Sequence, residues 1–282
     1  MRIAVTGAAG HLGRLVIAAL ESKGVADADI VAIVRNEAKA ADLAERGVQV
    51  AVAAYEDEVA LTAALAGVDR LVLVSGSEVG KRLAQHTSII NAAKAAGVAL
   101  IAYTSLLNAD TSTLDLAEEH RATEGLLADS GIDTVLLRNG WYLENFASAV
   151  ETARATGHTF GAAGEGRVSA AARRDYAEAA AVVVTSEGHA GKVYELAGRP
   201  AFTYAELAAV IGGILGTEVT YVDQSAGEYA STLKGAGLPA PIAAMFAGWD
   251  VATAAGALYS DSDDLQRLIG RESTPAAEAL AA

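Results

Sequence analysis

The segment RIAVTGAAGHLG, residues 2–13, joins a β-branched run to a glycine-rich turn. The run predicts a first strand over residues 3–6, and the apolar pattern after the turn predicts a helix over residues 12–22. Gly7, Gly10 and Gly13 fall where a tight turn, a close phosphate and a helix–strand contact exclude side chains. The spacing is Gly-x-x-Gly-x-x-Gly, which differs from the standard dinucleotide fingerprint. The strand–loop–helix context therefore favours a phosphate-binding loop, with an ordinary tight turn as the alternative.

The same alternation continues through the first half of the chain. Further strands are predicted over residues 30–34, 48–53, 71–75, 99–104 and 134–138, with helices over 37–45, 59–65 and 82–96. Apolar strands separated by helix-length crossovers belong in a parallel sheet that is covered on both faces. Left-handed helix caps are predicted at Gly24, Gly47, Gly67, Gly97 and Gly131. The pattern predicts an α/β fold with a Rossmann-type doubly wound parallel sheet.

The alternation weakens after residue 140. Helices are predicted near residues 176–186, 204–215, 226–236 and 261–269, and strands near 193–197 and 219–222. No long Ser/Gly/Pro-rich spacer marks a flexible junction. We predict one compact unit, with a nucleotide-binding core over residues 1–140 and the remaining sheet elements plus a small C-terminal α/β lobe over residues 141–282.

Composition argues against several classes of function. The chain has 35 Asp and Glu against 21 Lys and Arg, and the formal net charge of −14 disfavours nucleic acid as a partner. There is no cysteine, and the five histidines are widely separated, so no metal site is predicted. No apolar run approaches the roughly 20 residues that span a bilayer, and the first residues read as a strand, not a signal peptide. We predict a cytoplasmic protein without a membrane span.

Arg35 ends the second predicted strand, about 20 residues beyond the glycine loop, where an NAD-selective site carries an acidic residue. A guanidinium can pair with the 2′-phosphate of NADP, and no carboxylate is present there to repel it. The position favours NADP(H) over NAD(H). An exposed arginine at a strand end is the alternative.

Two further polar segments end predicted strands. Ser75-Gly76-Ser77 follows the fourth strand and Tyr103-Thr104-Ser105 ends the fifth. Because ligands of open α/β sheets bind outside the carboxyl ends of the strands, we expect both segments to line the nucleotide groove. Each segment taken alone is also compatible with a helix cap or a turn.

Together with Arg138-Asn139-Gly140-Trp141-Tyr142, these motifs resemble the NmrA-like atypical short-chain dehydrogenases, and among them the bacterial NAD(P)H:quinone oxidoreductases. The resemblance covers essentially the whole chain. It implies NADPH in an extended cleft, with its nicotinamide near the ends of strands five and six and a quinone-like acceptor beside it. It carries cofactor-binding roles over to Gly7, Gly10, His11, Leu12, Arg35, Ser75, Gly76, Ser77, Tyr103, Thr104 and Asn139.

Trp141 and Tyr142 are expected from the same resemblance to shape the acceptor pocket, with packing of the lobe as the alternative. Asn139 has a second interpretation as a local cap or turn former. Ordinary short-chain dehydrogenases carry a Tyr-x-x-x-Lys pair on the helix after strand five, and this chain has HRATE there, at residues 120–124. The usual tyrosine acid is therefore missing, and no catalytic residue is assigned. Solvent, His120 or Tyr142 could supply protons. For His120 the alternative is a solvated or capping helix residue that interacts with Glu124 one turn on.

Three functions are compatible with these features. The first is NADPH-dependent hydride transfer to a quinone or a similar electron-poor aromatic acceptor, because forming an aromatic hydroquinone demands little proton assistance. The second is a non-catalytic NADP(H)-sensing regulator that binds a protein partner. The third, a sugar-nucleotide epimerase or dehydratase, is disfavoured because those activities usually require the Tyr/Lys pair. A homodimer is left open.

Overall fold

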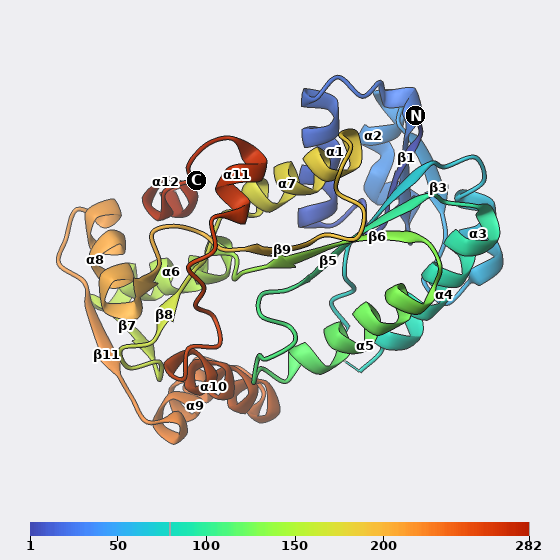
Figure 1. Cartoon of the computed structure of the whole chain (residues 1–282). Coiled ribbons are helices and arrows are strands. Elements are labelled where there is room, and N and C mark those ends of the chain that lie inside the picture. Colours follow the sequence, from blue (N-terminus) through green and yellow to red (C-terminus); the bar gives the residue numbers. More distant parts are fainter. Residues whose placement is uncertain (79, 282) are drawn as a thin grey trace.

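A seven-stranded sheet forms the centre of the computed structural model, which describes residues 1–78 and 80–281 (Figure 1). Its strands are β1 (Ile3–Val5), β2 (Ile30–Val34), β3 (Gln49–Val52), β4 (Arg70–Leu73), β5 (Leu100–Leu106), β6 (Asp133–Asn139) and β9 (Val193–Leu196). They lie in the order β3-β2-β1-β4-β5-β6-β9, and all neighbours are parallel. The order reverses between β1 and β4, as in a doubly wound sheet. The predicted fold class is confirmed.

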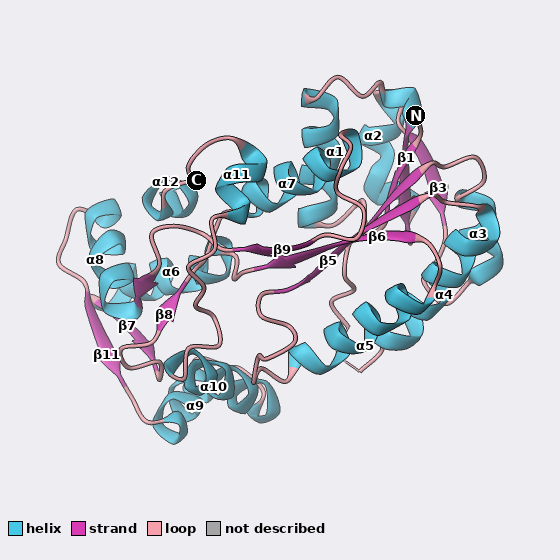
Figure 2. Cartoon of the chain, viewed as in Figure 1, coloured by secondary structure: helices cyan, strands magenta, loops and turns pink. Residues whose placement is uncertain are grey.

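Helices cover both faces of this sheet (Figure 2). One layer contains α1 (His11–Ser22), α2 (Ala41–Glu45), α7 (Arg173–Thr185) and α11 (Asp264–Ile269). The opposite layer contains α3 (Glu58–Ala64), α4 (Arg82–Ala96) and α5 (Leu116–Asp129). Each layer shares a separate apolar cluster with the sheet. Strand β2 is buried over its whole length for this reason, which accounts for its continuous apolar sequence.

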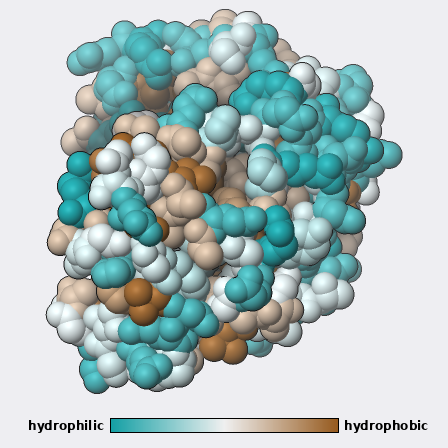
Figure 3. Space-filling view, turned by 90° about the vertical axis from the view of Figure 1, so that its left-hand side faces the viewer, coloured by the Kyte–Doolittle hydropathy of each residue, from teal (hydrophilic) through white to brown (hydrophobic). Residues whose placement is uncertain are grey.

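The lobe follows β6 and shares an apolar cluster with Leu106 at the carboxyl end of β5. Its surface in Figure 3 is largely polar or neutral, with apolar residues in small separate patches. Over the described residues, no helix is long and apolar enough to cross a membrane. The lobe elements are α6 (Ala147–Thr156), β7 (His158–Gly161), β8 (Arg167–Val168), β10 (Phe202–Thr203), α8 (Tyr204–Leu215), β11 (Thr220–Asp223), α9 (Ala226–Gly235), α10 (Ala240–Ala254) and α12 (Ala276–Ala281).

Several local predictions need correction. The helix predicted over residues 37–45 is a 3₁₀ turn, Glu37–Ala40, followed by the short α2, because the Asn36 side chain caps the turn by accepting from the Ala38 amide at 3.0 Å. The helix predicted over 261–269 begins three residues later, at Asp264. Helices α6, α10 and α12 were not predicted. The buried side of α10 consists of alanine, Asp250 and Thr253, so no large apolar stripe announces it.

The predicted helix-cap glycines are confirmed. All five have positive φ, between 71° and 99°, in the region that favours glycine.

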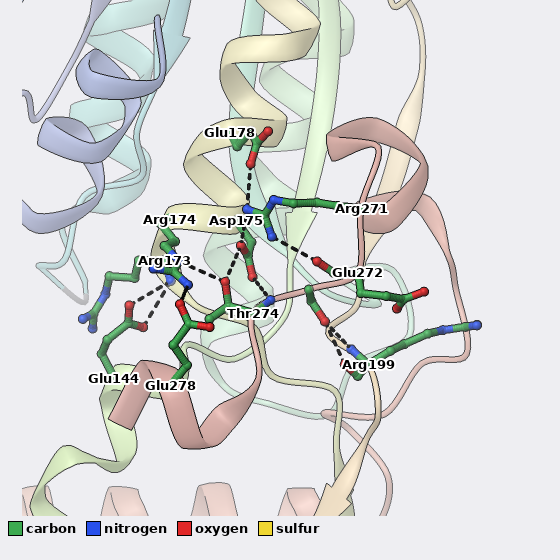
Figure 4. A network of polar contacts seen from close by, with 11 residues as sticks. Glu144, Arg173, Arg174, Asp175, Glu178, Arg199, Arg271, Glu272, Thr274 and Glu278 are labelled. Atoms are coloured by element: carbon green, nitrogen blue, oxygen red, sulfur yellow. Dashed lines mark hydrogen bonds and ion pairs between the residues drawn. The ribbon is translucent and has the colours of Figure 1, made fainter. Parts of the chain in front are cut away.

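A buried carboxylate fastens the C-terminal segment to the start of α7 (Figure 4). The side chain of Asp175 is fully buried, and its Oδ1 accepts from Arg271 Nη2 at 2.7 Å and from Thr274 Oγ1 at 2.9 Å. Its Oδ2 accepts from the Thr274 amide at 2.7 Å. On the other side of the same helix start, the Arg173 amide donates to Glu144 Oε1 at 2.9 Å. One helix terminus therefore joins the C-terminal segment to the segment that follows β6.

Candidate active site

One large cavity, of about 1140 Å³, follows the carboxyl ends of the central strands and continues into the lobe. It is lined by the glycine loop, the end of β2, the segment after β4, the ends of β5 and β6, and aromatic side chains of the lobe. This is the position where doubly wound sheets bind ligands. Of the residues predicted to form the site, the cavity brings together Gly7, Gly10, His11, Leu12, Arg35, Ser75, Gly76, Ser77, Thr104, Asn139, Trp141 and Tyr142.

The glycine loop leaves the first turn of α1 open to the cavity. Gly7 has a φ of +59°, and the Gly10 amide donates to the Gly7 carbonyl at 2.8 Å to close the turn. A Cβ on Gly13 would lie 2.3 Å from that carbonyl oxygen, so only glycine fits there. The first turn of α1 carries no acidic side chain, and no side chain caps it. The amides of a first helical turn have no partner within the helix, and the helix end is positive, so this terminus has the properties that suit an anion.

Arg35 lies at the β2 end of the cavity together with Lys39. Its Nη1 pairs with Glu78 Oε1 at 2.6 Å, while Lys81 Nζ lies 3.0 Å from Glu78 Oε2. The Lys81 ammonium and the Arg35 guanidinium hold the pKa of Glu78 below its usual value. The Arg35 side chain is still 65% exposed and therefore accessible to a second anion.

The segment after β4 is fixed by side chains from two neighbouring elements. The Ser75 amide donates to Thr104 Oγ1 of β5 at 2.9 Å, and Arg82 Nε of α4 donates to the Gly76 carbonyl at 3.0 Å. The Gly76 amide donates to His86 Nε2 at 3.2 Å. These contacts hold Ser75 and Gly76 in the cavity wall.

These bonds settle the protonation of His86. An amide can only donate, so Nε2 is the unprotonated nitrogen, and Nδ1 donates to Thr123 Oγ1 at 3.0 Å. Thr123 Oγ1 in turn donates to the Glu119 carbonyl at 2.9 Å. Burial, with a contribution from the Arg82 charge, lowers the pKa of His86 to about 3. The imidazole is neutral and serves to position the Gly76 segment.

Folding stability should consequently fall in acid. The pKa of His86 is about 3 in the folded chain and about 6.5 when unfolded, so below pH 6.5 only the unfolded chain takes up this proton. The contribution is intact above pH 6.5 and is lost progressively down to about pH 3. At pH 5 the free energy of unfolding that has been lost amounts to about 2 kcal/mol. Urea unfolding of His86→Gln should show a pH 7 to pH 5 loss smaller by about that amount.

His158→Gln is the matched control because His158 is exposed on β7 and distant in sequence from this segment. This variant should retain the pH dependence of the unaltered chain. An equal flattening in both histidine variants would contradict the assignment to His86.

Tyr103 does not line the cavity, contrary to the expectation for its segment. Side chains alternate along β5, so Thr104 lines the cavity while the Tyr103 ring is fully buried in the layer of α3, α4 and α5. The Tyr103 hydroxyl lies 2.7 Å from His120 Nδ1. His120 itself lines the cavity and is only 6% exposed.

The interpretation of His120 as a surface partner of Glu124 is therefore wrong. Glu124 instead forms a two-pronged pair with Arg138 of β6, with Nε to Oε1 at 3.1 Å and Nη2 to Oε2 at 2.8 Å. Sequence spacing placed both residues on one helix but gave no information about the strand beneath it. A role for His120 in the cavity could have been predicted from its position in the sequence, which corresponds to the tyrosine of the Tyr-x-x-x-Lys pair in short-chain dehydrogenases.

Asn139 ends β6 and is 3% exposed. Its Nδ2 lies 3.5 Å from the Tyr142 hydroxyl, and its Oδ1 is buried without a hydrogen-bond partner among the described residues. An unpaired buried amide oxygen costs about 1–3 kcal/mol. A hydrogen-bond donor on a bound ligand would remove this cost.

Trp141 and Tyr142 line the cavity and also pack against neighbours. The Trp141 ring meets Trp249 edge to face at 5.5 Å, and the Tyr142 ring meets Tyr176 at 5.4 Å. The guanidinium of Arg173 lies 4.9 Å from the centre of the Tyr142 ring. Both expectations for Trp141 and Tyr142 therefore hold, since each side chain lines the cavity and also packs against a neighbouring aromatic ring.

The lobe adds lining residues that sequence reasoning missed. Asp250 lies in this wall, accepting from the Tyr204 hydroxyl at 2.9 Å and from the Ala162 amide at 2.8 Å. Burial raises the pKa of Asp250 above its usual value. The aromatic lining residues of the lobe are spread singly over about a hundred positions, and no sequence pattern indicates that they share one cavity. The additional aromatic lining residues are Phe146, Phe160, Tyr204, Tyr229, Phe246 and Trp249.

The sequence model of the NmrA-like family matches residues 1–269. This chain belongs to the NmrA-like family. Quinone oxidoreductase 2 of Escherichia coli K12 is 53% identical over 278 residues, which are 99% of this chain and 97% of that protein. NAD(P)H azoreductase of Xenophilus azovorans is 30% identical over 242 residues, 86% of this NmrA-like chain and 83% of the relative.

Solved structures of family relatives match the whole fold. An NADPH-dependent quinone oxidoreductase of E. coli, complexed with NADPH, gives a TM-score of 0.95 at 53% identity, covering 99% of this chain and 98% of that one. Triphenylmethane reductase of Citrobacter, complexed with NADP(H), gives a TM-score of 0.92 at 38% identity over the same shares of the two chains. The NmrA-like resemblance drawn from the motifs is confirmed.

Proposed function

We propose that this chain is an NADPH-dependent reductase that transfers hydride to a quinone or a similar electron-poor aromatic acceptor. The observation that carries the proposal is the continuity of the cavity. An anion-binding helix terminus lies at one end and a wall of aromatic side chains at the other. A pyridine dinucleotide beside an aromatic acceptor matches this division of chemistry.

NADP(H) fits the residues present. The amides of the first turn of α1 suit the pyrophosphate, and Arg35 with Lys39 suits the 2′-phosphate. The unpaired Oδ1 of Asn139 offers an acceptor for the amide of the nicotinamide group. Because Gly13 has no side chain, the Gly7 carbonyl can lie close to the helix, and the loop keeps the conformation that presents these amides.

The chain contributes binding and orientation. When bound, NADPH supplies the hydride. The aromatic side chains of the lobe provide flat apolar surfaces on which an acceptor ring can lie while water is excluded. The Asp250 carboxylate adds a negative charge that also accommodates cationic aromatic acceptors. Quinone oxidoreductase 2 and triphenylmethane reductase bear names that fall in these two acceptor classes.

The activity is tested by titrating the protein with NADPH and NADH, and then adding benzoquinone under anaerobic conditions. Loss of reduced-nicotinamide absorbance is followed, and the protein-free reaction is subtracted. Protein-dependent oxidation that prefers NADPH is expected. Tight NADPH binding without turnover would favour the regulatory alternative, and absence of binding would exclude both functions.

Arg35→Ala should weaken NADPH binding by about 10- to 100-fold while leaving NADH binding within about threefold. The reason is that one charge-assisted contact to the 2′-phosphate, worth about 1.5–3 kcal/mol, is removed. Fluorescence titration with each cofactor measures the difference. Arg46→Ala is the control because Arg46 pairs with Glu21 on the surface at 3.0 Å and does not line the cavity. Equal weakening of both cofactors would contradict the role of Arg35.

Cellular location and assembly remain predictions. We propose a cytoplasmic location, in keeping with the sequence prediction, and a reducing compartment is compatible with a chain that has no cysteine. A homodimer is tested by light scattering on the purified chain.

A further inference from the structure

His120 has a combination of properties that the proposed function does not yet use. It lies on α5 and lines the cavity although it is only 6% exposed. Its Nδ1 is turned toward the buried Tyr103 hydroxyl at 2.7 Å. The remaining ring nitrogen, Nε2, is the one available to the cavity.

The surroundings define the protonation of both partners. Burial raises the pKa of Tyr103 above its usual range, so the phenol keeps its proton. Burial, together with Arg82 and the His86 ring, lowers the pKa of His120 to about 3, so the imidazole is neutral. Thr123 and Ser75 also lie near the phenol, but the hydrogen bond that its oxygen makes among the described residues is the one to His120 Nδ1. The phenol therefore donates to Nδ1, which leaves the proton of the neutral ring on Nε2.

We propose that His120 is a catalytic hydrogen-bond donor, whose Nε2–H, oriented by Tyr103, stabilises the quinone oxygen that gains negative charge during reduction. This rests on the proposed function. A neutral imidazole can polarise a carbonyl in this way without being an acid of ordinary strength. Because the donor is fixed before the reaction in a partly dry site, it is more effective than a water molecule.

The step balances without transfer of the imidazole proton. The hydride carries two electrons to the quinone, and the ring becomes an aromatic hydroquinone anion with the charge on oxygen. Nε2–H of His120 donates a hydrogen bond to that oxygen and keeps its proton. One proton from water then completes the hydroquinone. Tyr103 acts as a positioning residue because it fixes the tautomer from behind.

The proposal separates two acceptor classes. A triphenylmethane carbocation accepts hydride on carbon and becomes neutral, so no oxygen gains charge. Nε2–H has nothing to stabilise in that reaction. Loss of His120 should therefore slow quinone reduction far more than dye reduction, whereas a purely structural role would slow both alike.

The chain supplies a matched control pair. His189 Nδ1 lies 2.7 Å from the Tyr194 hydroxyl, the same distance as in the His120 pair, but neither residue lines the cavity. His120→Phe and Tyr103→Phe are compared with His189→Phe and Tyr194→Phe. Single-turnover rates with benzoquinone and with a triphenylmethane dye are measured at saturating NADPH, alongside the NADPH dissociation constant.

His120→Phe should lower the single-turnover rate with benzoquinone by about 10- to 100-fold, with the dye rate and NADPH affinity within about threefold. Tyr103→Phe should give a smaller loss of the same kind, and the control pair should give none. A His120→Phe variant with the unaltered quinone rate, or with equal losses for both acceptors, overturns the role of His120. Absence of quinone turnover in the unaltered chain overturns the proposed function as well.

Nitrogen-15 NMR of the histidine rings gives a readout that does not depend on turnover. In the unaltered chain at pH 7, the signals that disappear in His120→Phe should be those of a neutral ring protonated on Nε2. In Tyr103→Phe the same ring should become a mixture of tautomers. A ring protonated on Nδ1 alone, or on both nitrogens, overturns the proposal even if the chain reduces quinones.

Discussion

Gly13→Ala is expected to weaken NADPH binding by at least about 100-fold. The added Cβ would lie 2.3 Å from the Gly7 carbonyl oxygen and 2.8 Å from the Ala8 Cα. Both neighbours are backbone atoms, so no side-chain rotation relieves the clash, and the loop must move away from α1. Each amide–phosphate bond that is lost costs about 1.5–3 kcal/mol, and two such losses account for the expected factor.

The same variant should lose about 1–3 kcal/mol of unfolding free energy, as overpacked interiors usually do. Fluorescence titration gives the affinity, and urea denaturation gives the stability. Gly213→Ala is the control because Gly213 is an exposed residue of α8 with no atom near its added Cβ. Alanine there should be neutral or stabilising by up to about 1 kcal/mol. NADPH affinity within threefold of the unaltered value in Gly13→Ala would refute the need for glycine.

The cofactor end of the cavity was predictable because its signals are local. Residues 2–13 hold a strand, its turn and a helix start within one window, and Arg35 follows at the end of the next strand. The ends of parallel strands must meet at one edge, so Ser75 and Thr104 could be placed together without knowledge of their contacts. Alternation along β5 turns Tyr103 to the opposite face of the sheet from Thr104, so the prediction that the whole segment lines the groove is wrong for Tyr103.

The acceptor end depends on contacts between segments that are distant in sequence. Trp141 meets Trp249, and Tyr204 bonds Asp250, so α10 contacts two segments that are distant from it in sequence, and no local pattern specifies either contact. The predicted contact of His120 with Glu124 fails for the same reason, since the partner of His120 is Tyr103 on a strand beneath the helix. Helical spacing reveals which residues share a face but not which element covers that face.

Asp175→Ala should lower the free energy of unfolding by about 2–4 kcal/mol. The fully buried carboxylate accepts from Arg271 and from both the amide and the hydroxyl of Thr274. Its removal leaves buried donors unpaired, at about 1–3 kcal/mol each. Arg271 retains Glu178 at 2.7 Å and is itself 42% exposed, so the cost stays below that of a fully buried broken pair.

Glu278→Ala provides the comparison within the same network (Figure 4). Glu278 pairs with Arg174, but both side chains are at least half exposed, so the expected loss is below about 0.5 kcal/mol. Urea denaturation measures both variants, and Asp175→Asn should fall between them because an amide keeps one acceptor oxygen. If Asp175→Ala loses no more than Glu278→Ala, the C-terminal segment is held by apolar packing and not by this carboxylate. A large loss would instead show that residues 271–274 secure the start of α7, whose Arg173 contacts the Tyr142 ring in the cavity wall.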